Sequence, residues 1–116
     1  MGREHALLLG KRGAKVVVND LGENSAVSQP GKEIAKERVA ELVANEIIAQ
    51  GGEAVPNFDS VEHGDKIVQT AIEAFGRVDI LVCNAGTATS APVDKVPDAI
   101  WDHQMMVLNV LEWPIA

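Results

Sequence analysis

Two kinds of apolar pattern alternate along the chain and together predict a sheet covered by helices. Continuous apolar runs occur at residues 16–18 and 80–83, and a weaker strand candidate lies at 53–59. Such runs are typical of strands buried on both faces of a parallel sheet. Apolar residues with helical spacing lie between them, at 32–50 and 59–75. The alternation predicts an α/β fold with parallel strands joined by right-handed crossovers.

The predicted helices end at residues that commonly stop a helix. Residues 3–12 read as a first helix that ends at Gly13, and the helices at 32–50 and 59–75 end at Gly51 and Gly76. A last helix is expected from about residue 97 onward, because a proline there suits a first helical turn. In the weaker strand at 53–59, a proline at position 56 favours an edge position because it cannot donate a ladder hydrogen bond.

Three expectations about burial follow from this pattern. The thiol of Cys83, which lies inside the run at 80–83, is expected to be buried and inert. The helix at 59–75 is expected to bury an apolar stripe made of Ile67, Val68, Ala71, Ile72 and Phe75. The last helix is expected instead to expose the apolar residues Met105, Met106, Val107, Leu108, Leu111 and Trp113.

Composition and charge narrow the range of partners and compartments. The 116 residues suffice for one modest domain with an aliphatic core. A formal net charge of -7 argues against a nucleic-acid or anionic-membrane partner, since both require concentrated Lys and Arg. A single cysteine cannot form an internal disulfide, and no apolar run near the amino terminus is long enough for a signal peptide or a membrane span. We therefore expect a cytoplasmic location.

A metal site is not expected from the sequence. The histidines His5, His63 and His103 share no metal-ligand spacing with one another or with Cys83. Each lies in or beside a predicted helix, so a helix-surface position accounts for it.

Polar or small residues follow each of the three predicted strands. Asp20 ends the first, Asp59 the second, and Asn84 with Ala85 and Gly86 the third. In an open parallel sheet, ligands bind in the crevice beyond the carboxyl ends of the strands, so the three ends predict one shared crevice.

Each of these sites also has a purely structural interpretation. Asp20 alone could begin a loop, and the sequence Asn-Ala-Gly at 84–86 could be a turn. Asp59 with Ser60 could cap the following helix, with Glu62 as the reciprocal partner. In the functional interpretation, the Asp59 carboxylate and the backbone of Ser60 and Val61 lie against an adenine.

Three motifs of the chain are residues 12–22 (RGAKVVVNDLG), 57–61 (NFDSV) and 76–86 (GRVDILVCNAG). In these motifs, and in their order and spacing, the chain resembles the short-chain dehydrogenase/reductase family, and within it the (3R)-hydroxyacyl-CoA dehydrogenases. The resemblance implies a Rossmann-like three-layer αβα fold with a parallel sheet, and an NAD-dependent oxidoreductase that acts on a hydroxyl/carbonyl pair. It also implies a peroxisomal location as an alternative to the cytoplasm.

The resemblance assigns cofactor roles residue by residue. It implies that Asp20 holds the adenosine ribose, which favours NAD over NADP because a carboxylate there repels a 2′-phosphate. It implies that Asp59, Ser60 and Val61 surround the adenine. It further implies a nicotinamide-side wall made of Asn84, Ala85 and Gly86.

The departures from the family pattern predict an incomplete domain. The family's first strand, most of its glycine-rich turn and its C-terminal half have no counterpart here, and Gly2 resembles the last glycine of that turn. The catalytic Ser and the Tyr-x-x-x-Lys pair are also missing, and the chain contains no tyrosine. We therefore expect residues 1–116 to be a partial NAD(P)-binding Rossmann domain, inactive by itself, with no catalytic residue of its own. The alternative is a non-catalytic interaction module that forms a homo-oligomer or pairs with a full-length subunit.

Overall fold

The computed structural model describes residues 1–22, 38–86 and 91–109 of the chain. It divides into two units, Met1–Ile80 and Leu81–Ala116, and each unit is described by itself. Among the described residues, the first unit holds a sheet and three α-helices, and the second holds one α-helix.

A parallel sheet forms the centre of the first unit. Strands β1 (Lys15–Asn19) and β2 (Glu53–Asn57) pair along their whole length, which places Asn19 opposite Asn57. These are the two strands of the sheet within the described part of the chain. Pro56 is tolerated in β2 because an edge strand need not donate every ladder hydrogen bond. The strands predicted at the apolar run 16–18 and at 53–59, and their parallel direction, are confirmed.

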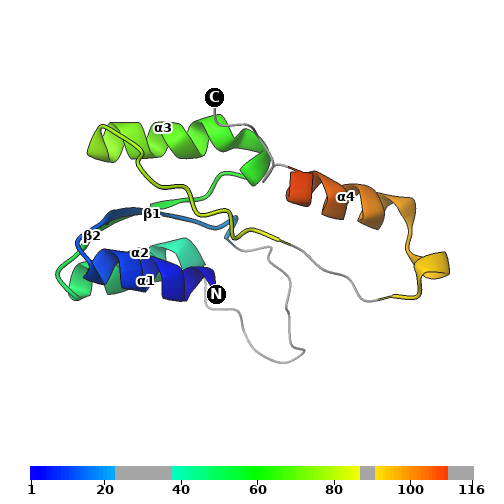
Figure 1. Cartoon of the computed structure of the whole chain (residues 1–116), viewed down its shortest axis with the longest axis horizontal. Coiled ribbons are helices and arrows are strands. Elements are labelled where there is room, and N and C mark those ends of the chain that lie inside the picture. The colour runs from blue at the N-terminus through cyan, green and yellow to red at the C-terminus, as the bar shows by residue number, and fades with distance from the viewer. Residues whose placement is uncertain (23–37, 87–90, 110–116) are drawn as a thin grey trace. The chain divides into compact units, whose positions relative to one another are not determined.

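Two helices cover one face of this sheet (Figure 1). They are α1 (Gly2–Lys11) and α2 (Val39–Ala49), and they pack on each other as well as on the strands. Helix α2 begins later than the predicted residue 32, because Arg38 is extended and stands at its N-cap. Residues 32–37 of the predicted helix lie outside the described residues.

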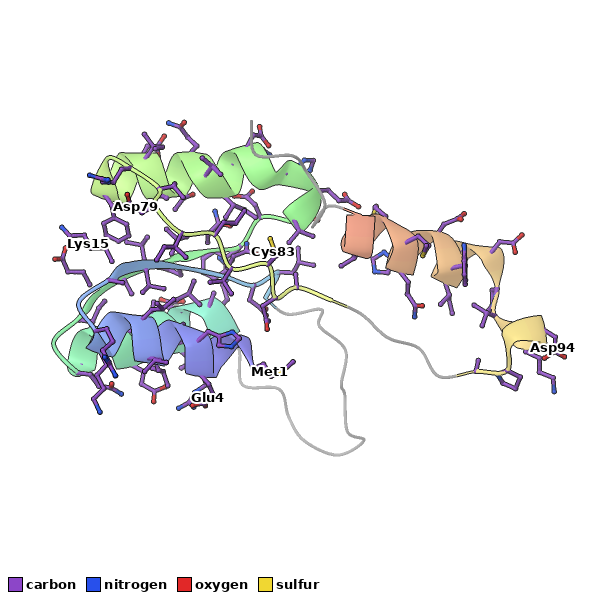
Figure 2. The ribbon with its side chains drawn as sticks, in the orientation of Figure 1. Met1, Glu4, Lys15, Asp79, Cys83 and Asp94 are labelled. Carbon is purple, nitrogen blue, oxygen red and sulfur yellow. The ribbon has the colours of Figure 1, made fainter. Side chains whose placement is uncertain are left out.

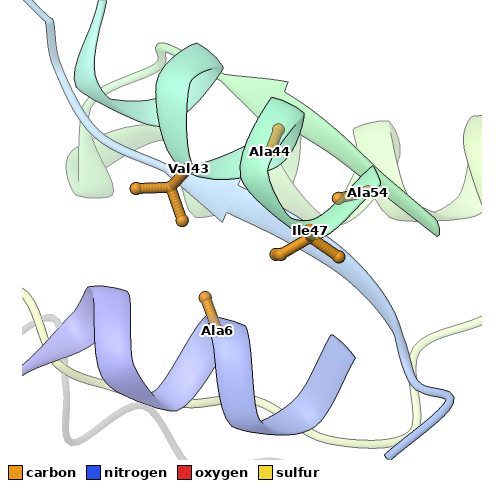
Figure 3. Close-up of a cluster of buried hydrophobic side chains, with 5 residues drawn as sticks. All are labelled: Ala6, Val43, Ala44, Ile47 and Ala54. Carbon is orange, nitrogen blue, oxygen red and sulfur yellow. The ribbon is translucent and has the colours of Figure 1, made fainter. Parts of the chain in front are cut away.

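The core of the first unit lies between α1, α2 and the sheet. Its buried side chains are Ala6, Val43, Ala44, Ile47 and Ala54 (Figure 3). Ile47 is 1% exposed and is the largest fully buried side chain. A Cβ at Gly10 of α1 would lie 2.6 Å from Cγ2 of Ile47, so the two helices approach closely at this point because residue 10 has no side chain.

A surface ion pair also joins α1 to α2. Arg3 donates hydrogen bonds to both carboxylate oxygens of Glu46, at 2.6 and 2.9 Å. These hydrogen bonds raise the pKa of Arg3. Because the pair is exposed, we assign the contact between the helices to the buried aliphatic residues rather than to this pair.

The opposite face of the sheet is covered by one helix, α3 (Gly64–Phe75), which follows a short 3₁₀ turn, η1 (Val61–His63) (Figure 1). The predicted buried stripe on this helix is wrong. No residue of α3, all of which is described, is buried, and Val68 and Ile72 are 43% and 42% exposed. A sheet of two strands is too narrow to cover the full apolar face of the helix. The helix ends as predicted at Gly76, which has a positive φ of 81°.

The third predicted strand, at 80–83, is also not observed. Residues 76–86 contain no strand, and Ile80, Leu81 and Val82 are 67%, 58% and 47% exposed. Cys83, labelled in Figure 2, is likewise exposed rather than buried. A parallel strand needs the backbone groups of a neighbouring strand. Within the described ranges the sheet pairing is β1 with β2 alone, so the apolar run has no partner.

The second unit contains the predicted last helix. It is α4 (Asp98–Asn109), preceded by a 3₁₀ turn, η2 (Val93–Lys95). Met105 is 39% exposed as expected, but Val107 is buried at 7%. The predicted exposure of the Leu108 side chain, of Leu111 and of Trp113 lies outside the described residues. None of the described helices is long and apolar enough to cross a membrane.

Candidate nucleotide-binding site

Two of the predicted site residues lie together at the carboxyl edge of the sheet. Asp20 comes directly after β1, and Asp59 comes two residues after β2. The backbone N–H of Asp20 donates to the carbonyl oxygen of Asn57 at 3.1 Å, so the pairing of the two strands continues to the edge itself. Parallel pairing thus places two aspartates that are 39 positions apart in the sequence at the same edge of the sheet.

The Asp20 carboxylate is held in a tight turn. Its Oδ1 accepts a hydrogen bond from the backbone N–H of Gly22 at 2.9 Å. Gly22 has a φ of 82°, which residues with a side chain rarely adopt, so the turn requires glycine. Among the described residues, Oδ2 of Asp20 makes no hydrogen bond. The turn therefore orients the carboxylate through its Oδ1.

Asp59, Ser60 and Val61 form the start of the η1 turn. The Ser60 hydroxyl accepts from the backbone N–H of Glu62 at 3.3 Å and so caps the η1 turn, whereas α3 follows His63 without a side-chain cap. The carbonyl oxygen of Ser60 accepts from the N–H of His63 at 2.8 Å. All three predicted adenine-site residues are half-buried.

A buried polar network behind this edge was missed by the sequence analysis. Asn57 is 5% exposed, and its side chain joins Asn19 of β1, Asp59 and Thr70 of α3. The signal that could have indicated it is the pair of asparagines at the last position of both strands. An asparagine at the end of a strand is also common in turns, so the sequence alone did not distinguish the two.

The remaining predicted site residues, Asn84, Ala85 and Gly86, belong to the second unit. Asn84 and Gly86 are exposed and Ala85 is half-buried. They follow a segment that does not form a strand, so their role as a nicotinamide-side wall stays a prediction.

No group of three or more His, Cys, Asp or Glu side chains that could hold a metal ion occurs in the part of the chain that the structure describes. A shallow hollow of about 200 Å³ lies at the opposite, amino end of the strands. It is lined by Gly10, Lys11, Gly13, Gln50, Gly51, Gly52 and Glu53. Since ligands of parallel sheets bind at the carboxyl edge, this hollow is not the candidate site.

Parallel strands, helices on both faces and acidic residues at the carboxyl edge define the class of protein: an α/β fold of the Rossmann type, present in part. The family model for short chain dehydrogenase matches residues 1–111. The chain therefore belongs to the short-chain dehydrogenase family.

Individual relatives agree with this assignment. The peroxisomal multifunctional enzyme type 2 of Drosophila melanogaster is 50% identical over 102 residues, which cover 88% of this chain and 16% of that protein. The crystal structure of a short chain dehydrogenase from Mycobacterium avium superposes with a TM-score of 0.76 at 38% identity, over 91% of this chain and 36% of that one. Carveol dehydrogenase from the same organism, solved in complex with NAD, has a TM-score of 0.72 at 23% identity, covers 95% of this chain and 41% of that one, and supports the fold alone.

The chain is much shorter than these relatives. It spans 11%, 16% and 22% of the lengths of three curated relatives, which are named as peroxisomal hydratase-dehydrogenase-epimerase or peroxisomal multifunctional enzymes. The family match and these relatives confirm the predicted resemblance to the short-chain dehydrogenases, and the relatives include peroxisomal multifunctional enzymes.

Proposed function

We propose that residues 1–116 are part of one NAD(P)-binding Rossmann domain and provide the adenosine side of an NAD site. The observation that carries this proposal is the pair of carboxylates, Asp20 and Asp59, at the carboxyl edge of two paired parallel strands. Family membership supports the same assignment.

The chemistry of the two carboxylates fits an adenosine. Within the described residues, Oδ2 of Asp20 and Oδ1 of Asp59 make no hydrogen bond, so each can accept one. The ribose presents hydroxyl donors to Asp20, and the adenine presents its amino group to Asp59, beside Ser60 and Val61. A carboxylate at the ribose repels a 2′-phosphate, so NAD is preferred to NADP.

The activity of the larger protein is proposed from its relatives. NAD supplies hydride transfer when it is bound. We propose a hydroxyl/carbonyl pair of the 3-hydroxyacyl-CoA class as the substrate, in keeping with relatives named as peroxisomal multifunctional enzymes and hydratase-dehydrogenase-epimerase. Those names favour a peroxisomal over a cytoplasmic setting. These 116 residues contain no tyrosine, and we propose that they bind cofactor without catalysing turnover.

Calorimetric titration of the chain with NAD and with NADP tests this proposal. We expect NAD to bind at least about tenfold more tightly, and Asp20→Asn to abolish most of that preference, because a hydrogen bond to a charged group contributes about 1.5–3 kcal/mol. Asp65→Asn, the same charge change at an exposed position of α3, is the matched control. An absence of NAD binding, or tighter binding of NADP, would contradict the proposal.

The alternative is a non-catalytic interaction module, and a specific observation favours it. Val68 and Ile72 of α3 are half-exposed, and so is Val78, which follows the helix. Covering them would bury apolar area in a homo-oligomer or against a full-length subunit. Light scattering after size exclusion distinguishes the two candidates: a monomer that binds NAD argues against the module.

A further inference from the structure

Asn57 is the most buried polar residue in the described part of the first unit, and its side chain makes four hydrogen bonds. Its Nδ2 donates to Oδ2 of Asp59 and to Oγ1 of Thr70, both at 2.9 Å. Its Oδ1 accepts from Nδ2 of Asn19 at 2.7 Å and from the backbone N–H of Asp59 at 3.0 Å. An amide has two donor hydrogens and can accept two hydrogen bonds, so this side chain is fully satisfied.

Only one orientation of the Asn57 amide fits its neighbours. If oxygen and nitrogen were exchanged, the oxygen would face the Asp59 carboxylate and the nitrogen would face the Asp59 backbone N–H. The first contact would pair two acceptors and the second two donors. The neighbours therefore determine which atom points at Asp59, and the amide acts as a donor to that carboxylate.

The same network holds the backbone of Asp59. Nδ2 of Asn19 donates to the carbonyl oxygen of Asp59 at 2.8 Å, and Oδ1 of Asn57 accepts from the N–H of Asp59. Asp59 is thus hydrogen-bonded at its N–H, its carbonyl oxygen and one carboxylate oxygen, by residues from both strands. Thr70, whose hydroxyl donates to the carbonyl oxygen of Lys66 at 3.0 Å, links the network to α3.

We propose that Asn57 is a positioning residue that aims the Asp59 carboxylate at the exocyclic amino group of a bound adenine, so that Asn57 determines how well the site distinguishes adenine from a base lacking that amino group. This inference rests on the proposed NAD site. By occupying Oδ2 of Asp59, the amide leaves Oδ1 as the acceptor for the ligand. Asn57 lies behind Asp59 and acts through it.

The test compares NAD with nicotinamide hypoxanthine dinucleotide, which carries a carbonyl in place of the amino group, by calorimetric titration of the full chain. We expect the native chain to prefer NAD by about tenfold to a hundredfold, the range expected for one hydrogen bond to a charged group. Asn57→Asp keeps the shape and the Oδ1 acceptor but replaces the donor facing Asp59 with a second carboxylate oxygen. It should reduce the preference to less than about threefold.

Two further variants make the result interpretable. Thr70→Val removes the acceptor that holds the amide from the other side, and should lower the preference in the same direction by a smaller factor. It tests the proposal even where Asn57→Asp does not fold, as judged by circular dichroism. Asn45→Asp makes the same chemical change at an exposed position of α2 and should leave the preference unchanged.

The outcomes separate this inference from the proposed function. If the native chain binds NAD and the hypoxanthine dinucleotide equally, or if folded Asn57→Asp and Thr70→Val variants both keep the native preference, the positioning role is overturned while the NAD site stands. If the native chain binds neither dinucleotide, the proposed function fails and the inference fails with it.

Discussion

The helices on the two faces of the β1–β2 sheet reach different degrees of burial. On one face, α1 and α2 pack on the strands and on each other, and Ile47 is 1% exposed. On the other face, α3 is the one helix of the described part of the first unit, and Ile72 is 42% exposed. All three helices carry apolar residues, but α1 and α2 also pack on each other, whereas the contacts given for α3 are with the strands and the turn η1. A helix buries its apolar stripe only when a second helix or a wider sheet closes its flanks.

The largest effect on stability should come from the face of the sheet that α1 and α2 cover. Ile47→Ala removes the largest fully buried side chain and should lower the free energy of unfolding by about 2–5 kcal/mol, through lost burial and the remaining cavity. The matched change in α3, Ile72→Ala, should lower the free energy of unfolding by less than about 1 kcal/mol. Urea denaturation followed by circular dichroism measures both. Equal losses would mean that the two faces are packed alike.

The next effect concerns the close approach of α1 and α2. Gly10→Ala places a methyl group 2.6 Å from Cγ2 of Ile47 and should destabilise the chain by about 1–3 kcal/mol, as overpacking does. In the Ile47→Ala background the methyl group has space, so the double variant should lose less than the sum of the two single losses. Additive losses would show that the contact is not the cause.

A control for this change is a glycine in α3, on the other face of the sheet. A Cβ at Gly64 would meet no atom within 4 Å, and its backbone is helical. Gly64→Ala should therefore stabilise the chain by about 0.4–1 kcal/mol, by restricting the unfolded state.

The smallest expected difference between the two faces concerns the hydrogen exchange of backbone amides. Backbone amides of α3 should exchange with solvent at least about tenfold faster than those of α2, because local opening of α3 exposes little apolar surface that is not already exposed. Amides of residues 78–83 should exchange faster still, since no strand pairs with them. Hydrogen exchange followed by mass spectrometry measures all three segments. Protection at 78–83 equal to that of α2 would indicate that these residues pair with the sheet as a further strand.

Much of the candidate site followed from short stretches of sequence. The valines at 16–18 form a strand in any context that supplies a partner, and Asp20 after them was placed correctly at a strand end. The position of Asp20 and Asp59 at the same edge also followed, because parallel strands bring their carboxyl ends together. The network around Asn57 did not follow, since it joins two strands and a helix whose contacts no local pattern encodes.

By itself, the sequence determined the helices, the two paired strands, the glycines that end α3 and turn the chain after Asp20, and the family. These depend on local backbone preference and on the spacing of apolar residues, which are properties of short segments. Tertiary structure alone decided that Ile80, Leu81 and Val82 do not form a strand, that α3 stays half-exposed, and that the Asn57 amide grips Asp59. A strand and a buried face both require partners elsewhere in the fold, and the same apolar run is buried or exposed according to whether those partners are there.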